Sequence, residues 1–391
     1  MLVSFRPRPF VVRFLPAAAL AAAGFASLGL LGCATASAPR QAEQERVVPR
    51  RLELLGRAVL PSLELNGTIL GGLSGLTWVS GDDFLAISDD KSEFGPPRFY
   101  RLSIRPEGEP DGKGRRIRAE VRGWTSIREQ GGGPLEAKRA DLEGIAALGE
   151  GDVFVSSEGW GERLIPPFVT HLAADGAWRE DLPLPEAFVP TADGRRGVRS
   201  NLAFESLTTT PDRRYLFTAT ENALAQDGPP SEAGISSPSR LLRYDLEARR
   251  WDRQWLYPVE PPRFRPQPGA VRAAGLVDLE AIDAGHLLAL ERSFERGHGY
   301  NIRIFAVETA GAEDISSRLA MTDGPPPRPV RKRLLLDLTR LGIRLDNLEG
   351  LALGRRLPDG RRLLVLVSDD NYKHGQQINQ VLVFALTLSP R

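Results

Sequence analysis

The sequence predicts an all-β protein with the architecture of a β-propeller. One strand–turn–strand phrase recurs at intervals of about 60 to 75 residues, longer than a bare propeller blade and so consistent with loop insertions. Short runs of apolar, β-branched and aromatic residues alternate with clusters of glycine and proline, and no long stretch has a helical period. A solenoid would require shorter and more uniform repeats, so radial repetition fits better.

The phrase is clearest at 141–159, DLEGIAALGEGDVFVSSEG. It comprises an apolar strand that carries a glutamate, a turn, a second apolar strand and then an acidic residue. Related copies are GGLSGLTWVSGDDFLAISDD at 71–90, AFESLTTTPDRRYLFTATEN at 203–222, VDLEAIDAGHLLALERS at 277–293, and NLEGLALG with LLVLVSDDN within 347–371. Five copies favour five blades, and a six-bladed ring with one blade lacking the phrase is the alternative.

Further strands complete most units. We expect third strands at 99–104, 168–174, 239–246, 301–307 and 380–386, and outer fourth strands at 116–124, 251–257 and 331–338. The last unit lacks a fourth strand, whereas the segment 51–60 before the first phrase is a spare strand. We therefore expect the ring to close by pairing of the N-terminal and C-terminal segments.

The N-terminus has the order of a secretory signal. A basic head is followed by an uncharged run from Phe14 to Gly32 and then by Cys33, the one cysteine of the chain. The sequence LLGC resembles the lipobox of bacterial lipoproteins, which implies a lipid anchor on Cys33. With Ala34 next, the resemblance favours the outer membrane, facing the periplasm. An ordinary signal peptide or a single membrane helix is the alternative.

These features predict a signal peptide at 1–32, a flexible tether at 33–50 and a propeller domain at 51–391. With 51 basic and 50 acidic residues, the chain lacks the basic excess of a nucleic-acid-binding protein. A single cysteine allows no internal disulfide bond. We expect a monomer whose partners are the membrane, through its anchor, and a small substrate or envelope ligand.

In a propeller, a residue that recurs once per blade forms a ring around the central channel. The first predicted ring holds Glu143, Glu205, Glu280 and Glu349, with Ser74 in the first unit, and the second holds Asp89, Glu158, Glu221, Glu291 and Asp369, with Asp90 and Asp370 beside two of them. Converging carboxylates repel one another unless a cation lies among them. Hard oxygen ligands favour Ca²⁺, with Mg²⁺ as second candidate. For the first ring, hydrogen bonds to the backbone of a neighbouring blade are an equally good interpretation.

Three cations follow these acids and are candidates for binding a phosphoryl group: Lys91, Arg292 and Lys373. Solvated loop charges are the alternative. A serine hydrolase is poorly supported, because the residues around Ser74 do not form a Gly-x-Ser-x-Gly motif.

Together, the motifs GLSGLTW, FLAISDD, DLEGIA, FVSSEG, FESLTTTPD, LFTATEN, DLEAID, LLALERSF, NLEGLALG and LVLVSDDN resemble the phytase-like family described as having "esterase-like activity of phytase". The resemblance covers nearly all of 60–388. It implies a relation to β-propeller phytases, which hydrolyse phosphate monoesters with Ca²⁺ at the channel mouth. By this resemblance, the candidate metal ligands of this chain are Asp89, Asp90, Glu158, Glu221, Glu291, Asp369 and Asp370.

The Asp-Asp-Pro signature of the well-known propeller phytases is not found here, so the resemblance supports the fold more than phytate as the substrate. The resulting hypothesis is a Ca²⁺-type phosphoesterase of the cell envelope, in which a metal-bound water attacks a phosphate ester and a ring carboxylate acts as base. The alternative is a non-catalytic propeller that binds a ligand or a protein partner in the periplasm.

Overall fold

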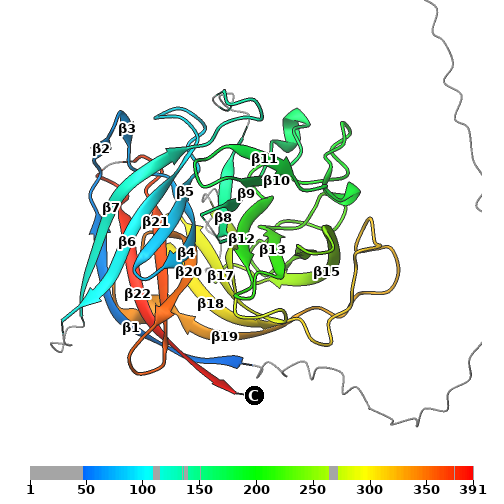
Figure 1. The fold of residues 1–391 in the computed structure, drawn as a ribbon. Coiled ribbons are helices and arrows are strands. Elements are labelled where there is room, and N and C mark those ends of the chain that lie inside the picture. The colour runs from blue at the N-terminus through cyan, green and yellow to red at the C-terminus, as the bar shows by residue number, and fades with distance from the viewer. Residues whose placement is uncertain are drawn as a thin grey trace, which may run out of the picture. The chain divides into compact units, whose positions relative to one another are not determined.

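Five four-stranded antiparallel sheets surround a central axis in the computed structural model of the chain (Figure 1). The structure describes residues 47–108, 115–133, 135, 140–149, 151–263, 272–373 and 375–390. The first strands of neighbouring sheets pack against one another around a closed ring, so these strands are innermost. Over the described residues the prediction of a five-bladed propeller is therefore confirmed, and the six-bladed alternative is wrong.

The chain builds the blades in sequence order, each from the axis outward. Blade 1 contains β4 (Leu73–Ser80), β5 (Asp83–Ser88), β6 (Arg98–Glu107) and β7 (Arg116–Ser126), and blade 2 contains β8 (Leu142–Ala147), β9 (Val153–Ser157), β10 (Phe168–Leu172) and β11 (Trp178–Asp181). Blade 3 contains β12 (Phe204–Thr209), β13 (Tyr215–Thr220), β14 (Ser237–Asp245) and β15 (Arg250–Val259), and blade 4 contains β16 (Arg272–Ala281), β17 (His286–Glu295), β18 (Gly299–Glu308) and β19 (Arg331–Asp337). Blade 5 contains β20 (Asn347–Arg356), β21 (Arg362–Asp369), β22 (Asn379–Pro390) and β1 (Val47–Leu60). A hairpin of β2 (Glu64–Leu65) and β3 (Thr68–Ile69) and the short 3₁₀ turns η1 (Gly161–Arg163), η2 (Glu186–Phe188) and η3 (Leu338–Leu341) lie between these strands.

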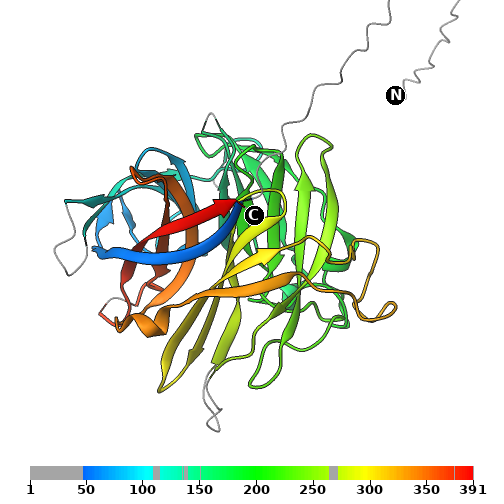
Figure 2. The same cartoon turned by 90° about the horizontal axis from the view of Figure 1, so that it is seen from below.

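The ring is closed by the two ends of the described chain, as predicted. Strand β1 pairs antiparallel with β22, from Val47 opposite Pro390 to Leu60 opposite Asn379. Figure 2 shows the two strands side by side, blue and red. Strand β1 begins at Val47, four residues before the expected start, so the predicted tether extends too far at its C-terminal end. The signal peptide, Cys33 and the tether up to residue 46 lie outside the described residues.

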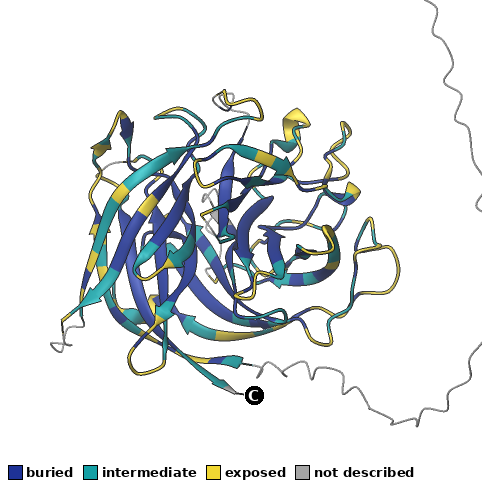
Figure 3. Ribbon diagram, viewed as in Figure 1, coloured by how far each residue is buried: buried dark blue, intermediate teal, exposed yellow. Residues whose placement is uncertain are grey.

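The hydrophobic core lies between the blades. One cluster packs Leu76, Phe84 and Tyr100 of blade 1 against Val365 and Val383 of blade 5. Figure 3 shows burial concentrated on the inner strands and exposure on the outer strands and loops. Buried apolar surface stabilises a fold by about 25 cal/mol per Å², so each blade stabilises its neighbours. Within the described residues, no helix is long and apolar enough to cross a membrane.

Candidate active site at the channel mouth

One end of the channel opens into a cavity of about 1320 Å³ lined by residues of all five blades. Its acidic lining consists of Asp89, Asp141, Glu143, Glu158, Glu205, Glu221, Asp346, Glu349 and Asp369. Its cationic lining consists of Lys91, Arg292, Arg296, Arg344 and Lys373. Most of the carboxylates predicted from the sequence therefore do meet at one mouth, and the three predicted cations lie there too.

A β-bulge in every innermost strand decides which residue faces this mouth. In each blade the ladder between the first and second strands shifts register at the mouth end. Such a bulge turns an unpaired side chain out of the regular pleat. The residues that follow the last regular pair form the first-strand ring: Ser74, Glu143, Glu205, Val277 and Glu349. Blade 4 thus contributes Val277, and the expectation that Glu280 completes the ring is corrected.

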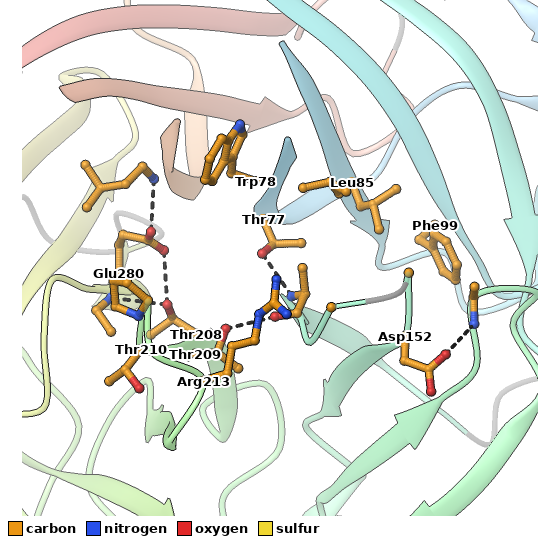
Figure 4. Close-up of a pocket in the computed structure, with 18 of the residues that line it drawn as sticks. Thr77, Trp78, Leu85, Phe99, Asp152, Thr208, Thr209, Thr210, Arg213 and Glu280 are labelled. Carbon is orange, nitrogen blue, oxygen red and sulfur yellow. Dashed lines mark hydrogen bonds between the residues drawn. The ribbon is translucent and has the colours of Figure 1, made fainter. Parts of the chain in front are cut away.

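Glu280 instead lies three residues further along β16, at the opposite end of the channel. It lines a separate pocket of about 250 Å³ together with Thr77, Thr208 and Arg213 (Figure 4). One carboxylate oxygen accepts a hydrogen bond from the backbone N–H of Leu353 (3.1 Å). The other accepts one from the Thr208 hydroxyl (3.0 Å). Glu280 therefore connects blades 3, 4 and 5, which is the structural role that the sequence left open for this ring.

The second ring also differs from the predicted one in blade 4. In each blade, the second-strand residue that pairs with the first-strand residue just before the bulge is followed by the residue of this second ring. These residues form the second-strand ring: Asp89, Glu158, Glu221, Arg292 and Asp369. Glu291 pairs with Leu276 and occupies the slot of Ser88 and Ser157, so Arg292 takes the position of a carboxylate.

Three predicted metal ligands lie outside the mouth and have other partners. Asp90 forms a buried ion pair with Arg98 (2.8 Å). Asp370 accepts hydrogen bonds from the backbone of Gly72 (3.2 Å) and the amide of Asn379 (3.1 Å). Glu291 accepts hydrogen bonds from the hydroxyl of Tyr257 (2.8 Å) and from Nζ of Lys332 (2.5 Å), and sits 3.6 Å from Arg303. These contacts lie within and between blades, so the geometry gives these acids a structural role.

A cluster of carboxylates on blade 2 is the best candidate for holding a cation. One carboxylate oxygen from each of Asp141, Glu143 and Glu158 lies within 4.8 Å of the others. All three residues are buried. Sequence reasoning missed Asp141, although it lies two positions before Glu143, the spacing that returns to the same face of a strand. Asn347 stands in the same relation to Glu349 in blade 5 and was missed in the same way.

The cluster is fixed in place by contacts with blades 1 and 3. The Ser74 hydroxyl donates a hydrogen bond to Glu143. The backbone N–H of Ala203 donates to Glu158 (2.6 Å). Nζ of Lys91 forms an ion pair with a carboxylate oxygen of Asp141 (2.5 Å). One lysine facing three buried carboxylates leaves a deficit of positive charge.

Burial, followed by the charges of neighbouring carboxylates, raises the pKa values of Asp89, Glu143 and Glu158. The pKa of Asp89 rises to about 8 through burial and then through the charges of Glu349 and Asp141. Burial, followed by the charges of Asp141 and Glu221, raises the pKa of Glu158 to about 8. The pKa of Glu143 is raised well above its usual range for the same reasons. Near neutral pH these groups must either keep protons or share a cation. The donors are all hard oxygens, so the residues present fit Ca²⁺ or Mg²⁺.

Arg292 faces the acidic cluster from blade 4. It donates a hydrogen bond to Oδ1 of Asn347 (2.6 Å), and lies 3.3 Å from Glu349 and 3.7 Å from Glu221. Its Nε is buried and has no hydrogen-bond partner among the described residues. Gly275 makes room for Glu221, because a Cβ at this position would lie 2.2 Å from Cγ of the glutamate. The mouth thus places one guanidinium among carboxylates on rigid strand ends.

Comparison with known proteins gives a family. The family described as "Phytase-like: Esterase-like activity of phytase" matches residues 68–372. A solved structure of a "putative glycoside hydrolase" from Parabacteroides distasonis is 12% identical, with a TM-score of 0.41, and the match covers 85% of this chain and 96% of that one. No match was found among curated proteins.

Proposed function

This chain belongs to the phytase-like family with esterase-like activity of phytase, and we propose that it is a hydrolase that cleaves a phosphate ester at its acidic mouth with the help of a divalent cation. The observation that carries the proposal is the buried cluster of Asp141, Glu143 and Glu158 facing Arg292 in one cavity. A phosphoryl group needs positive charge on its oxygens and a nearby group that exchanges protons, and this mouth offers both.

Asp141, Glu143 and Glu158 would hold the cation, with Asp89 and Glu205 beside them in the same cavity. A bound Ca²⁺ or Mg²⁺ would supply Lewis-acid polarisation of a phosphoryl oxygen and a lowered pKa for water. The sequence-predicted ligands Asp90, Glu291 and Asp370 are left out of this set because other groups occupy them.

The side chains of the mouth then have distinct roles. The guanidinium of Arg292 binds phosphoryl oxygens and is kept in orientation by Asn347 and Glu349. Lys373 lines the same cavity and adds positive charge toward the substrate. Asp89, whose pKa rises through burial to about 8, is suited to take the proton of the attacking water, because proton exchange is most efficient when the pKa is near the working pH. The new bond joins the water oxygen to phosphorus, and the bond to the alcohol oxygen breaks as that oxygen gains a proton.

The test is hydrolysis of a phosphate monoester by the purified protein with Ca²⁺, with Mg²⁺ and with excess chelator. We expect cation-dependent turnover that falls at least about 100-fold in Glu158→Gln and Arg292→Met, the range for loss of one charge-stabilising group. Glu280→Gln is the matched control, because it removes a carboxylate from the other end of the channel. Turnover that persists in chelator would contradict the metal dependence, and cation binding without turnover would indicate a binding module instead.

We also propose that the protein acts on the periplasmic side of the envelope through a lipid on Cys33. The support is the sequence LLGC after an apolar run, in residues outside the described part of the chain. Metabolic labelling with a radioactive fatty acid tests this: label should appear in the wild-type protein and be lost in Cys33→Ala. A wild-type protein without label would contradict the anchor.

A further inference from the structure

Charge is divided unevenly around the mouth. Blades 1 to 3 contribute six carboxylates and a single cation: Asp89, Asp141, Glu143, Glu158, Glu205 and Glu221, with Lys91. That lysine is already bound to Asp141. The other half, from blades 4 and 5, contributes four cations, Arg292, Arg296, Arg344 and Lys373. The half that suits a metal ion and the half that suits an anion are therefore separate.

The carboxylates of the second half are largely engaged by the protein itself. Asp346 accepts hydrogen bonds from the backbone N–H groups of Asn347 (2.9 Å) and Ile378 (3.1 Å). Asp369 accepts a hydrogen bond from the backbone N–H of Asn371 (2.6 Å). Arg344 donates to the carbonyl oxygen of Gln376 (3.0 Å) and so keeps its charge facing the cavity. Arg292 already has two carboxylate neighbours, Glu349 (3.3 Å) and Glu221 (3.7 Å), so an anion bound here shares its guanidinium with them.

An apolar wall adjoins the same cations. Phe294 and Tyr300 stand on neighbouring strands β17 and β18, with ring centroids 4.9 Å apart. Ile343 and Leu345 of the loop after η3 continue this wall into the cavity lining. All four side chains are partly exposed, so a ligand can cover apolar surface that the fold leaves in contact with water. The Tyr300 hydroxyl accepts a hydrogen bond from the side-chain amide of Gln377 (3.0 Å), which orients the tyrosine ring.

We propose that the substrate is a monoester in which a single phosphoryl group is joined to an apolar, ring-bearing alcohol. This proposal rests on the proposed function and narrows it. The phosphoryl group lies between Arg292 and the carboxylate cluster, and the alcohol packs on Phe294 and Tyr300. Nine acidic against five basic residues line the cavity, so a substrate with many phosphates, such as phytate, meets repulsion that a single phosphoryl group avoids.

Matched substrates test the apolar wall without changing the leaving group. Ethyl phosphate and 2-phenylethyl phosphate both release a primary alkoxide, so the chemistry is the same and only the phenyl ring differs. We expect kcat/KM to be at least about tenfold higher for 2-phenylethyl phosphate, since small differences in apolar contact are worth factors of 10 to 200. Phe294→Ala should remove most of that preference, and Phe294→Leu, which keeps an apolar side chain, should retain part of it.

The outcomes separate this inference from the proposed function. Turnover of both esters at equal efficiency, or a preference for phytate over either, overturns the inference and leaves the proposed function standing. Turnover of none of these phosphate esters with Ca²⁺ or Mg²⁺ overturns the proposed function and the inference together. A preference for the phenyl ester that Phe294→Ala leaves intact overturns the assignment of the wall.

Discussion

Replacing Glu280 with glutamine should stabilise the propeller at alkaline pH and leave it nearly unchanged in acid. Burial, opposed by the hydrogen bonds from Leu353 and Thr208, raises the pKa of Glu280 from 4.5 to about 7. The folded state therefore holds a proton that the unfolded chain releases above pH 4.5. A group with a raised folded-state pKa stabilises the fold fully below its unfolded pKa, and that contribution is lost as pH rises through the folded value.

The magnitude follows from the size of the shift. Each pKa unit corresponds to about 1.4 kcal/mol, so a rise from 4.5 to about 7 gives a ceiling of roughly 3 kcal/mol in the free energy of unfolding. Glu280 is partly exposed to its pocket, and solvent screening reduces this to about 1–2 kcal/mol. Glutamine keeps an oxygen for the N–H of Leu353 and carries no charge to desolvate. The variant should therefore gain about 1–2 kcal/mol at pH 9.

The measurement is urea-induced unfolding of wild type and Glu280→Gln at pH 4.5 and pH 9. Glu64→Gln, at an exposed position, is the control for the chemical change itself. A second variant, Glu280→Ala, should be less stable than wild type at pH 4.5, where Glu280 is neutral, because the buried N–H of Leu353 loses its acceptor, at a cost of about 1–3 kcal/mol. The reasoning is refuted if Glu280→Gln is less stable than wild type at pH 9.

Three further predictions follow from the same geometry. Asp90→Asn should lower the free energy of unfolding by about 3–5 kcal/mol, because it leaves Arg98 buried without its charge partner. The rise in Tm produced by Ca²⁺ should persist in this variant. Loss of that rise would indicate that Asp90 is a metal ligand. Glu143→Gln should abolish the Ca²⁺-induced rise in Tm. In calorimetry with chelator at pH 8, the metal-free variant should be at least as stable as wild type. A Ca²⁺-induced rise that is retained would contradict the assignment of Glu143 as a metal ligand. Leu55→Asp, on the strand that closes blade 5, should lower Tm by several degrees or prevent folding, because this buried residue belongs to the core between blades 1 and 5. An unchanged Tm would contradict closure of the ring by β1.

The blade number and the closure of the ring could be predicted from sequence because both depend on repetition. Each blade repeats its apolar strands, and the spare segment before the first copy matches the strand missing from the last. The outer strand β11 of blade 2 was not predicted, because three of its four residues, Trp178–Asp181, are charged and the strand is too short to show alternation. The predictions for residues 1–46 remain predictions.

Asp90 and Asp370 lie outside the mouth, and both ring positions of blade 4 were predicted wrongly because of the pairing register. Matching the sequence repeats aligns Leu279-Glu280 with Leu142-Glu143. The side-chain direction, however, is set by strand pairing, and the pairing makes Val277 the structural equivalent of Glu143. In the second ring, an offset of one residue exchanges Glu291 for Arg292. A shift of one residue turns a side chain to the other face of a strand, and only the pairing register reveals it.

The most direct test of the cation site is a calorimetric titration of the metal-free protein with Ca²⁺ at pH 7, repeated in two buffers of different ionisation enthalpy. Because the carboxyls of Asp89 and Glu158 have pKa values raised to about 8, binding must displace protons. The structure predicts saturable binding with net proton release, and loss of both in Glu158→Gln. Absence of saturable binding, or binding that Glu158→Gln leaves intact, would contradict a metal site at the mouth.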